Sequence, residues 1–209
     1  MKKICIAGSL HWDILVNTNN IPKKDETVKG SKVNYLFGGK GGNQALSANR
    51  YGSNTYIIGR VGKDNFGKKI LNTLKKSTID IKQLQIGTEK SGMSVAVVDK
   101  KGNYSATIVS GANLNIDCKK IIIKKDTGIL LLQNEIPEKI NLIAAKKAKE
   151  QNCEVWINAA PARKINRELL ELTDIIIMNK VEAEFYKKTI FKNKLYLSLI
   201  HISEPTRRY

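Results

Sequence analysis

The sequence has few of the residues that build a metal centre. Its 209 residues include two histidines, His11 and His201, and three cysteines, Cys5, Cys118 and Cys153. The cysteines are odd in number, far apart and without the spacing of zinc ligands, which excludes a zinc cluster and a disulfide framework. Scattered thiols of this kind are typical of a reducing cytoplasm, where we expect the protein to reside.

Long apolar runs are also missing. No segment reaches the length that spans a bilayer, so we expect no membrane partner. The N-terminal residues, MKKICIAGSLHWD, lack the apolar core and cleavage site of a signal peptide and are interpreted as a first strand.

Acidic residues are scarce beside basic ones. Lysine and arginine number 36 against 19 aspartates and glutamates, which gives a formal net charge of +17. A basic protein can bind nucleic acid. Here the excess is mostly lysine spread along the chain, with no basic block interleaved with aromatic residues. We therefore interpret the charge as a lysine-rich surface and expect no nucleic-acid partner.

Glycine, by contrast, is concentrated in residues 37–62, FGGKGGNQALSANRYGSNTYIIGRVG. Glycine allows positive φ and close approach of a ligand, and the first amides of a helix lack partners within it. Lys40 adds a cation and Asn43 an amide. The stretch therefore predicts a site for a polar, hydroxyl-rich or anionic small molecule. A flexible glycine turn with a solvated lysine is the alternative that these residues leave open.

Alternating strand and helix patterns predict an α/β fold. Strands are predicted for the apolar runs at residues 3–7, 128–133, 154–158 and 175–178. Helices are predicted at residues 67–76, 137–151, 167–172 and 181–188. Such an alternation favours a parallel sheet covered on both faces. Residues 14–37 and 94–109 form a separate small β element, and the second of these is a predicted hairpin.

The glycine stretch resembles the first signature of the PfkB/ribokinase family of carbohydrate kinases. That pattern asks for small residues, an asparagine and glycines at fixed distances, which here are Gly38, Gly39, Gly41, Asn43, Ala45, Gly52 and Gly62. The resemblance runs from Lys3 to about Lys188. It implies a ribokinase-like, doubly wound, mostly parallel sheet with a small β-sheet lid, whose strands lie within residues 14–37 and 94–109.

The resemblance also implies which residues hold a sugar. Asp13 can accept hydrogen bonds from neighbouring hydroxyls, and the resemblance implies this role for a residue that by itself is interpreted as a turn or cap aspartate. His11 stands where ribokinases of the best-known type usually have asparagine. The other implied sugar-binding residues are Gly39, Lys40, Asn43 and Glu135. Glu135 is equally interpreted as a glutamate favoured in the first turn of a helix.

Asn179 and Glu182 resemble the family's N-x-x-E motif on the nucleotide side. The resemblance implies ATP and Mg²⁺ as cofactors, with Glu182 holding the metal through water, which suits the hydration of Mg²⁺. The same pair is also a good helix cap with its capping-box partner. A monovalent cation such as K⁺, and a homodimer formed through the lid, stay open.

The resemblance weakens near the C-terminus, and the catalytic G-A-G-D motif of the family is missing. Residues from Leu197 to Arg207 match the translation of a transposase adapter used in sequencing libraries. We therefore expect a fold truncated at the C-terminus, with a partial ribokinase-like domain at residues 1–196 and an artefactual tail at residues 197–209.

The resulting hypothesis is ATP-dependent phosphorylation of a sugar primary hydroxyl. Ribose, giving ribose 5-phosphate, is the first choice of substrate for the parent protein, and the fragment itself is expected to be inactive. A kinase of a nucleoside or of another pentose or hexose is one alternative. A non-catalytic sugar-binding protein is the other.

Overall fold

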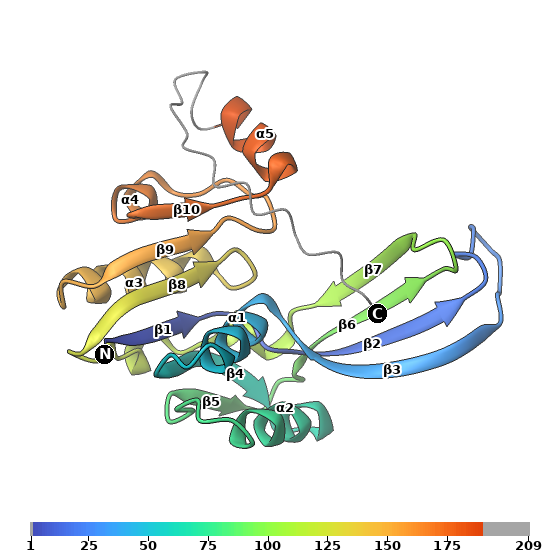
Figure 1. Cartoon of the computed structure of the whole chain (residues 1–209), viewed down its shortest axis with the longest axis horizontal. Helices are drawn as coiled ribbons and strands as arrows, with labels where there is room; N and C mark the ends of the chain where they lie inside the picture. Colours follow the sequence, from blue (N-terminus) through green and yellow to red (C-terminus); the bar gives the residue numbers. More distant parts are fainter. Residues whose placement is uncertain (1, 190–209) are drawn as a thin grey trace.

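The computed structural model describes residues 2–189, so the predicted tail lies outside the described residues. A six-stranded sheet forms the body, and a four-stranded sheet projects from it as a lid (Figure 1). The body strands are β1 (Lys3–Ala7), β4 (Thr55–Gly62), β5 (Leu84–Gly87), β8 (Thr127–Gln133), β9 (Glu154–Asn158) and β10 (Ile175–Ile177). The lid strands are β2 (His11–Thr18), β3 (Gly30–Gly38), β6 (Gly92–Val98) and β7 (Tyr104–Val109).

Along the chain, helices alternate with the strands of the body, as the sequence pattern predicted. The helices are α1 (Lys40–Arg50), α2 (Asn65–Lys75), α3 (Glu138–Lys149), α4 (Arg167–Glu171) and α5 (Lys180–Thr189). Two short 3₁₀ helices, η1 (Gly111–Asn115) and η2 (Cys118–Lys120), follow the lid. Among residues 2–189, no helix combines the length and the apolar character needed to cross a membrane.

The body sheet has the order β10-β9-β8-β1-β4-β5, and all its strand pairs are parallel. The chain proceeds to one side of β1 through β4 and β5, and to the other side through β8, β9 and β10. Ligands of such sheets bind at the carboxyl ends of the strands where the direction reverses. Here the reversal lies between β1 and β8, so Ser9 and Glu135 lie at the expected edge.

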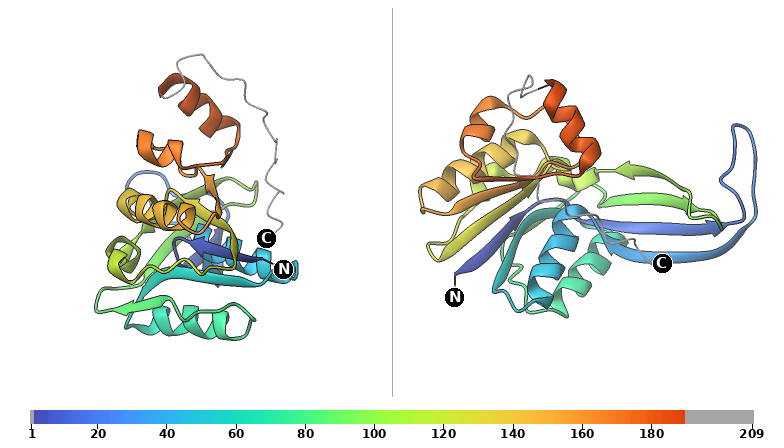
Figure 2. Two further views of the ribbon diagram at one scale, coloured as in Figure 1. Left: turned by 90° about the vertical axis from the view of Figure 1, so that its left-hand side faces the viewer. Right: turned by 45° about the horizontal axis from the view of Figure 1, so that its top comes forward.

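Apolar side chains cover both faces of this sheet. Ile6 of β1 packs on one face with residues of α1 and α2, including Ala45 and Ile70. Its neighbour Cys5 packs on the other face with Ala144 of α3, because successive strand residues point to opposite faces. Figure 2 shows these helices on the two sides of the sheet. The predicted doubly wound α/β fold with a small β-sheet lid is confirmed.

The lid has the order β3-β2-β6-β7, with β2 parallel to β6 and antiparallel to β3. Its strands extend beyond the predicted limits, since β2 begins at His11 and β6 at Gly92. Asp13 therefore belongs to a lid strand that begins just past the carboxyl end of β1, rather than to a turn or a helix cap. The polar residues His11 and Asp13 alternate with Trp12 and Ile14, as the two faces of a strand require.

Two of the glycines before Asn43 shape the start of α1. α1 begins at Lys40, directly after Gly39, whose φ of 83° favours glycine. Gly41 lies inside the first helical turn, and a Cβ there would come within 2.6 Å of the carbonyl carbon of Gly8. Gly41 thus allows α1 to pack closely on the end of β1, rather than acting as a hinge in a loop.

Candidate functional site

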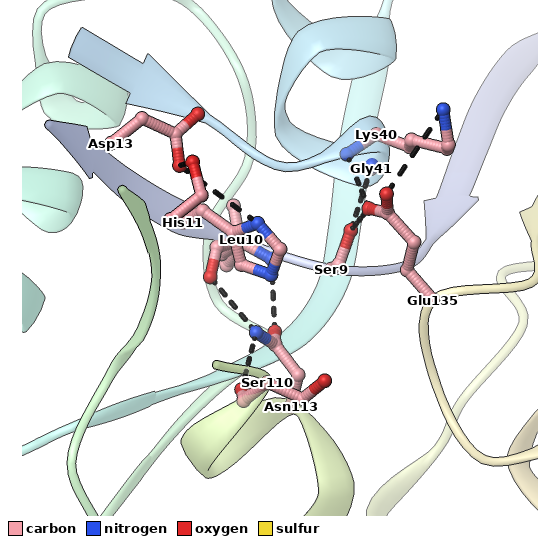
Figure 3. Close-up of polar contacts among 10 residues, drawn as sticks. Ser9, Leu10, His11, Asp13, Lys40, Gly41, Ser110, Asn113 and Glu135 are labelled. Carbon is pink, nitrogen blue, oxygen red and sulfur yellow. Dashed lines mark hydrogen bonds and ion pairs between the residues drawn. The ribbon is translucent and has the colours of Figure 1, made fainter. Parts of the chain in front are cut away.

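Polar side chains from distant parts of the sequence meet where the lid joins the body (Figure 3). Ser9 follows β1, His11 and Asp13 begin β2, Lys40 begins α1, and Glu135 follows β8. The parallel sheet brings the ends of β1 and β8 together, and the lid strand continues directly from the first of them.

The Glu135 carboxylate is held at the N-terminus of α1. Its Oε2 accepts hydrogen bonds from the Ser9 hydroxyl and from the Lys40 backbone amide, the latter at 2.9 Å. The next amides of α1 bond to Ser9, that of Gly41 to the hydroxyl and that of Gly42 to the carbonyl. The amides predicted to receive a ligand are therefore bonded to the protein. Glu135 Oε1 is left facing Lys40 Nζ at 4.0 Å.

The Asp13 carboxylate lies between neighbouring lid strands. Its Oδ1 accepts a hydrogen bond of 2.7 Å from the Ser94 hydroxyl of β6. Its Oδ2 lies over Gly38 of β3, where an added Cβ would come within 1.9 Å of it. The Asp13 side chain remains 27% exposed, so a ligand between body and lid can reach it.

The His11 imidazole lies beside Asp13 but is only 3% exposed. Its Nδ1 is 4.0 Å from Asp13 Oδ1, and within residues 2–189 its Nε2 has no hydrogen-bond partner. Burial lowers the pKa of His11, while nearby Glu135 and Asp13 act in the opposite direction. The ring is therefore neutral at pH 7, and Asp13 presents the more accessible polar surface.

Asn113 of η1 fixes the chain between β1 and the lid. Its Oδ1 accepts from the Leu10 amide at 2.9 Å, and its Nδ2 donates to the Leu10 carbonyl at 2.9 Å. The fully buried side chain pairs with Leu10 much as a neighbouring strand would. Leu10 immediately precedes His11, so this contact determines where the first lid strand starts.

A cavity of about 420 Å³ adjoins Glu135, between β7 and the loops that follow β8 and β9. Ligand pockets typically measure about 300–1,000 Å³. Its lining includes Ile108, Asn134, Pro161 and Arg163. The cavity offers apolar walls with a few polar groups, which is the usual composition of a small-molecule pocket.

Not all predicted sugar-binding residues converge in this way. Gly39 shapes the turn before α1, while Asn43 is exposed and its side chain makes no hydrogen bond within the part of the chain that the structure describes. Asp13, Lys40 and Glu135 are the predicted residues whose polar groups lie nearest the junction of lid and body.

Asn179 and Glu182 form a reciprocal cap at the start of α5. The Asn179 amide donates to Glu182 Oε2 at 2.8 Å, and the Glu182 amide donates to Asn179 Oδ1 at 2.9 Å. Within residues 2–189, no three His, Cys, Asp or Glu side chains are grouped to hold a metal ion. Glu182 Oε1 has no protein hydrogen bond among those residues, which fits a single carboxylate that holds Mg²⁺ through water.

Sequence reasoning missed Ser9, Ser94 and Asn113, which hold the predicted residues in place. Ser9 had a usable signal, because a serine directly after a buried strand lies at the ligand-binding edge. Ser94 and Asn113 had none, since their partners are distant in sequence and were set by the register of the lid.

Together, the doubly wound body, the β lid and the polar groups between them define an α/β protein with a candidate small-molecule site where the two sheets meet. Comparison with known proteins gives the same result. The model of the pfkB family carbohydrate kinases matches residues 1–204, and the chain belongs to this family.

The curated relatives include ribokinases of Lactococcus lactis and Bacillus subtilis, 34% and 32% identical over 200 and 189 residues. These alignments cover 92% and 88% of this chain and 64% of each relative, so the chain spans about two thirds of their length. A solved structure of Arabidopsis thaliana ribokinase, complexed with ribose and ATP, superposes with a TM-score of 0.78 at 28% identity. That superposition covers 90% of this chain and 63% of the other.

Proposed function

We propose that the kinase to which this chain corresponds transfers the γ-phosphoryl group of ATP to the primary hydroxyl of ribose, giving ribose 5-phosphate. The observation that carries the proposal is the meeting of Asp13, Lys40 and Glu135 between lid and body, in a family of carbohydrate kinases. The ribokinase relatives support ribose as the first substrate to test.

In this proposal, Asp13 and Glu135 accept hydrogen bonds from sugar hydroxyls, because ionised carboxylates are acceptors only. Lys40, whose Nζ lies 4.0 Å from Glu135 Oε1, donates to a sugar oxygen. His11 shapes the wall beside Asp13 as a neutral ring. Gly39 keeps the turn before α1 close to the sugar, and Asn43 contributes its amide once a ligand is bound.

The nucleotide side is proposed to lie at the start of α5. Asn179 and Glu182 would support Mg·ATP, with Glu182 holding Mg²⁺ through water while the phosphates supply further oxygen ligands. ATP is supported by the ligands named for the Arabidopsis structure. A monovalent cation such as K⁺ remains part of the proposal to be tested with the intact kinase.

We further propose that the 209 residues bind sugar without phosphorylating it. The sequence contains no G-A-G-D segment, whose aspartate we expect to act as the base on the sugar hydroxyl. We also propose a cytoplasmic location, supported by three free thiols, and self-association through the lid.

Isothermal titration of the 209-residue chain with ribose, other sugars and nucleosides tests the binding proposal. Asp13→Asn should weaken ribose binding by about 10- to 100-fold, because hydrogen bonds to charged groups contribute about 1.5–3 kcal/mol. Asp25→Asn is the matched control, since Asp25 is exposed in a turn with φ of 60°.

This titration, together with an assay for phosphorylation of ribose by Mg·ATP, distinguishes the candidate functions. Preference for a nucleoside or hexose over ribose would replace the substrate, and absence of binding by all of them would contradict the proposal. Turnover of ribose with Mg·ATP by the chain alone would overturn the expected inactivity. A parent protein that binds ribose but has no kinase activity would favour a non-catalytic sugar-binding protein.

A further inference from the structure

The Tyr186 hydroxyl is a buried centre of hydrogen bonds on α5. The side chain is 1% exposed, and its oxygen lies 2.8 Å from the Arg163 carbonyl and 3.2 Å from the Ala159 carbonyl. It also accepts from Asn134 Nδ2 at 2.9 Å. One hydroxyl therefore joins α5 to the loop after β9 and to the end of β8.

Asn134 connects this centre to the proposed sugar site. It immediately precedes Glu135 and is 4% exposed. Its amide donates to the Ala160 carbonyl at 3.0 Å, and its Nδ2 donates to the Pro161 carbonyl at 3.0 Å as well as to Tyr186. The backbone that carries the Glu135 carboxylate is thereby fixed to α5 through a side-chain contact.

Glu182 lies on the same face of α5 as Tyr186, one helical turn earlier, because residues i and i+4 of a helix share a face. Both are buried, and the negative charge of Glu182 contributes to the raised pKa of Tyr186, after the larger effect of burial. A continuous chain of contacts thus runs from Glu135 through Asn134 and Tyr186 to the proposed nucleotide side.

Packing alone does not explain why the polar side chains of Asn134 and Tyr186 are buried together. Buried polar groups cost free energy unless they are hydrogen-bonded, and two apolar side chains of similar shape would fill the same space without that requirement. A hydrogen bond between two buried side chains adds a fixed direction and distance, which apolar contacts lack. The pair is therefore suited to setting the spacing between the end of β8 and α5.

We propose that Asn134 and Tyr186 are positioning residues that hold the sugar-binding carboxylate of Glu135 in a fixed relation to Glu182. The inference rests on the proposed function. Phosphoryl transfer depends chiefly on the alignment of the attacking hydroxyl with the nucleotide phosphate. Through this link, ribose bound at Glu135 also stabilises α5.

Hydrogen exchange of the whole 209-residue chain, with and without saturating ribose, tests the link. Ribose should slow exchange of the α1 amides, which adjoin Lys40, and of the α5 amides. We expect about fivefold slowing or more in α5, the lower range of typical coupling between sites. Tyr186→Phe removes only the hydroxyl, so α5 should lose its response to ribose while α1 keeps it.

Tyr51→Phe is the matched control, because Tyr51 is 89% exposed and should leave both responses unchanged. Asn134→Ala removes the same bond from the other side and should act like Tyr186→Phe. An α5 response that persists in both variants, or that is missing from the wild type while α1 responds, overturns the inference alone. Absence of any response to ribose, in α1 as well as α5, contradicts the proposed ribose binding on which the inference rests.

Discussion

The buried imidazole of His11 makes the stability of the protein depend on pH. Burial lowers its pKa, the carboxylates of Glu135 and Asp13 oppose that shift, and the ammonium of Lys40 adds to it. In the unfolded chain a histidine titrates near pH 6.5. Below that pH the unfolded state binds a proton that the folded state does not, so the stability that the neutral ring provides is lost as pH falls toward the folded pKa.

We therefore expect the free energy of unfolding to fall more steeply between about pH 7 and pH 5 in the wild type than in His11→Asn. Urea titrations at several pH values in this range provide the measurement. His201 is present in both proteins, so its contribution cancels in the comparison. Parallel pH dependences of the two proteins would show that His11 is not held neutral by the fold.

At the same scale, the sequence predicted the candidate ligand-binding residues better than it predicted the residues that hold them in place. Asp13, Lys40 and Glu135 were singled out from their motifs, and the structure places all of them at the junction of lid and body. The bond between Ser9 and Glu135 joins residues 126 positions apart and exists only because β1 and β8 are neighbours. No local pattern carries that information.

Among the elements, α2 is joined to the lid by one carboxylate. Asp64 caps the helix by accepting from the Gly67 amide at 2.7 Å, and it accepts from the amide and hydroxyl of Ser91, just before β6. Burial by itself would raise the pKa of Asp64, but the bonds from Ser91 and Gly67 lower it below its usual value. The Asp64 carboxylate thus stabilises both the start of α2 and the backbone at Ser91, just before β6.

Asp64→Ala should lower the free energy of unfolding by about 1–2 kcal/mol for the cap, with a further loss from the unpaired Ser91 amide. Asn166→Ala is the matched comparison, because Asn166 caps α4 through the Glu168 amide alone. Urea unfolding of both variants measures the difference. Equal losses would mean that the contact to Ser91 contributes nothing to stability.

Most of the helices and strands were predicted from the sequence, but the first residues of some of them were not. The strand at Glu154–Asn158 was predicted with its observed bounds, because a short apolar run between polar residues leaves little choice. β2 was predicted too short, since the polar residues at its start serve the site rather than the core. The sequence did not reveal that α1 begins at Lys40, because glycine normally disfavours a helix. Here the close packing of Gly41 on Gly8 requires glycine.

At the scale of the whole molecule, the net charge of +17 opposes self-association. One face of the lid nevertheless has no charged residue on its own strands, and the nearby Lys69 ammonium of α2 lies 5.2 Å from the Tyr35 ring centroid. Register places Tyr35, Ile14 and Val95 in one row across the strands, and Val33, Val16 and Val97 in the next. Val33, Tyr35 and Val95 are 48%, 53% and 42% exposed. Apolar side chains gathered on one face in this way mark an interaction surface, and a second copy of the chain offers the same apolar face.

Sedimentation velocity should therefore show a dimer for the wild type and a monomer for Val33→Glu, in which a buried carboxylate would face an apolar surface without a partner. Val181→Glu is the matched control, because it makes the same substitution on α5 at a residue that is 73% exposed. Both variants lower the net positive charge equally, so general repulsion cannot account for a difference between them. A monomeric wild type, or a Val33→Glu protein that remains dimeric, would show that this face of the lid does not join two copies.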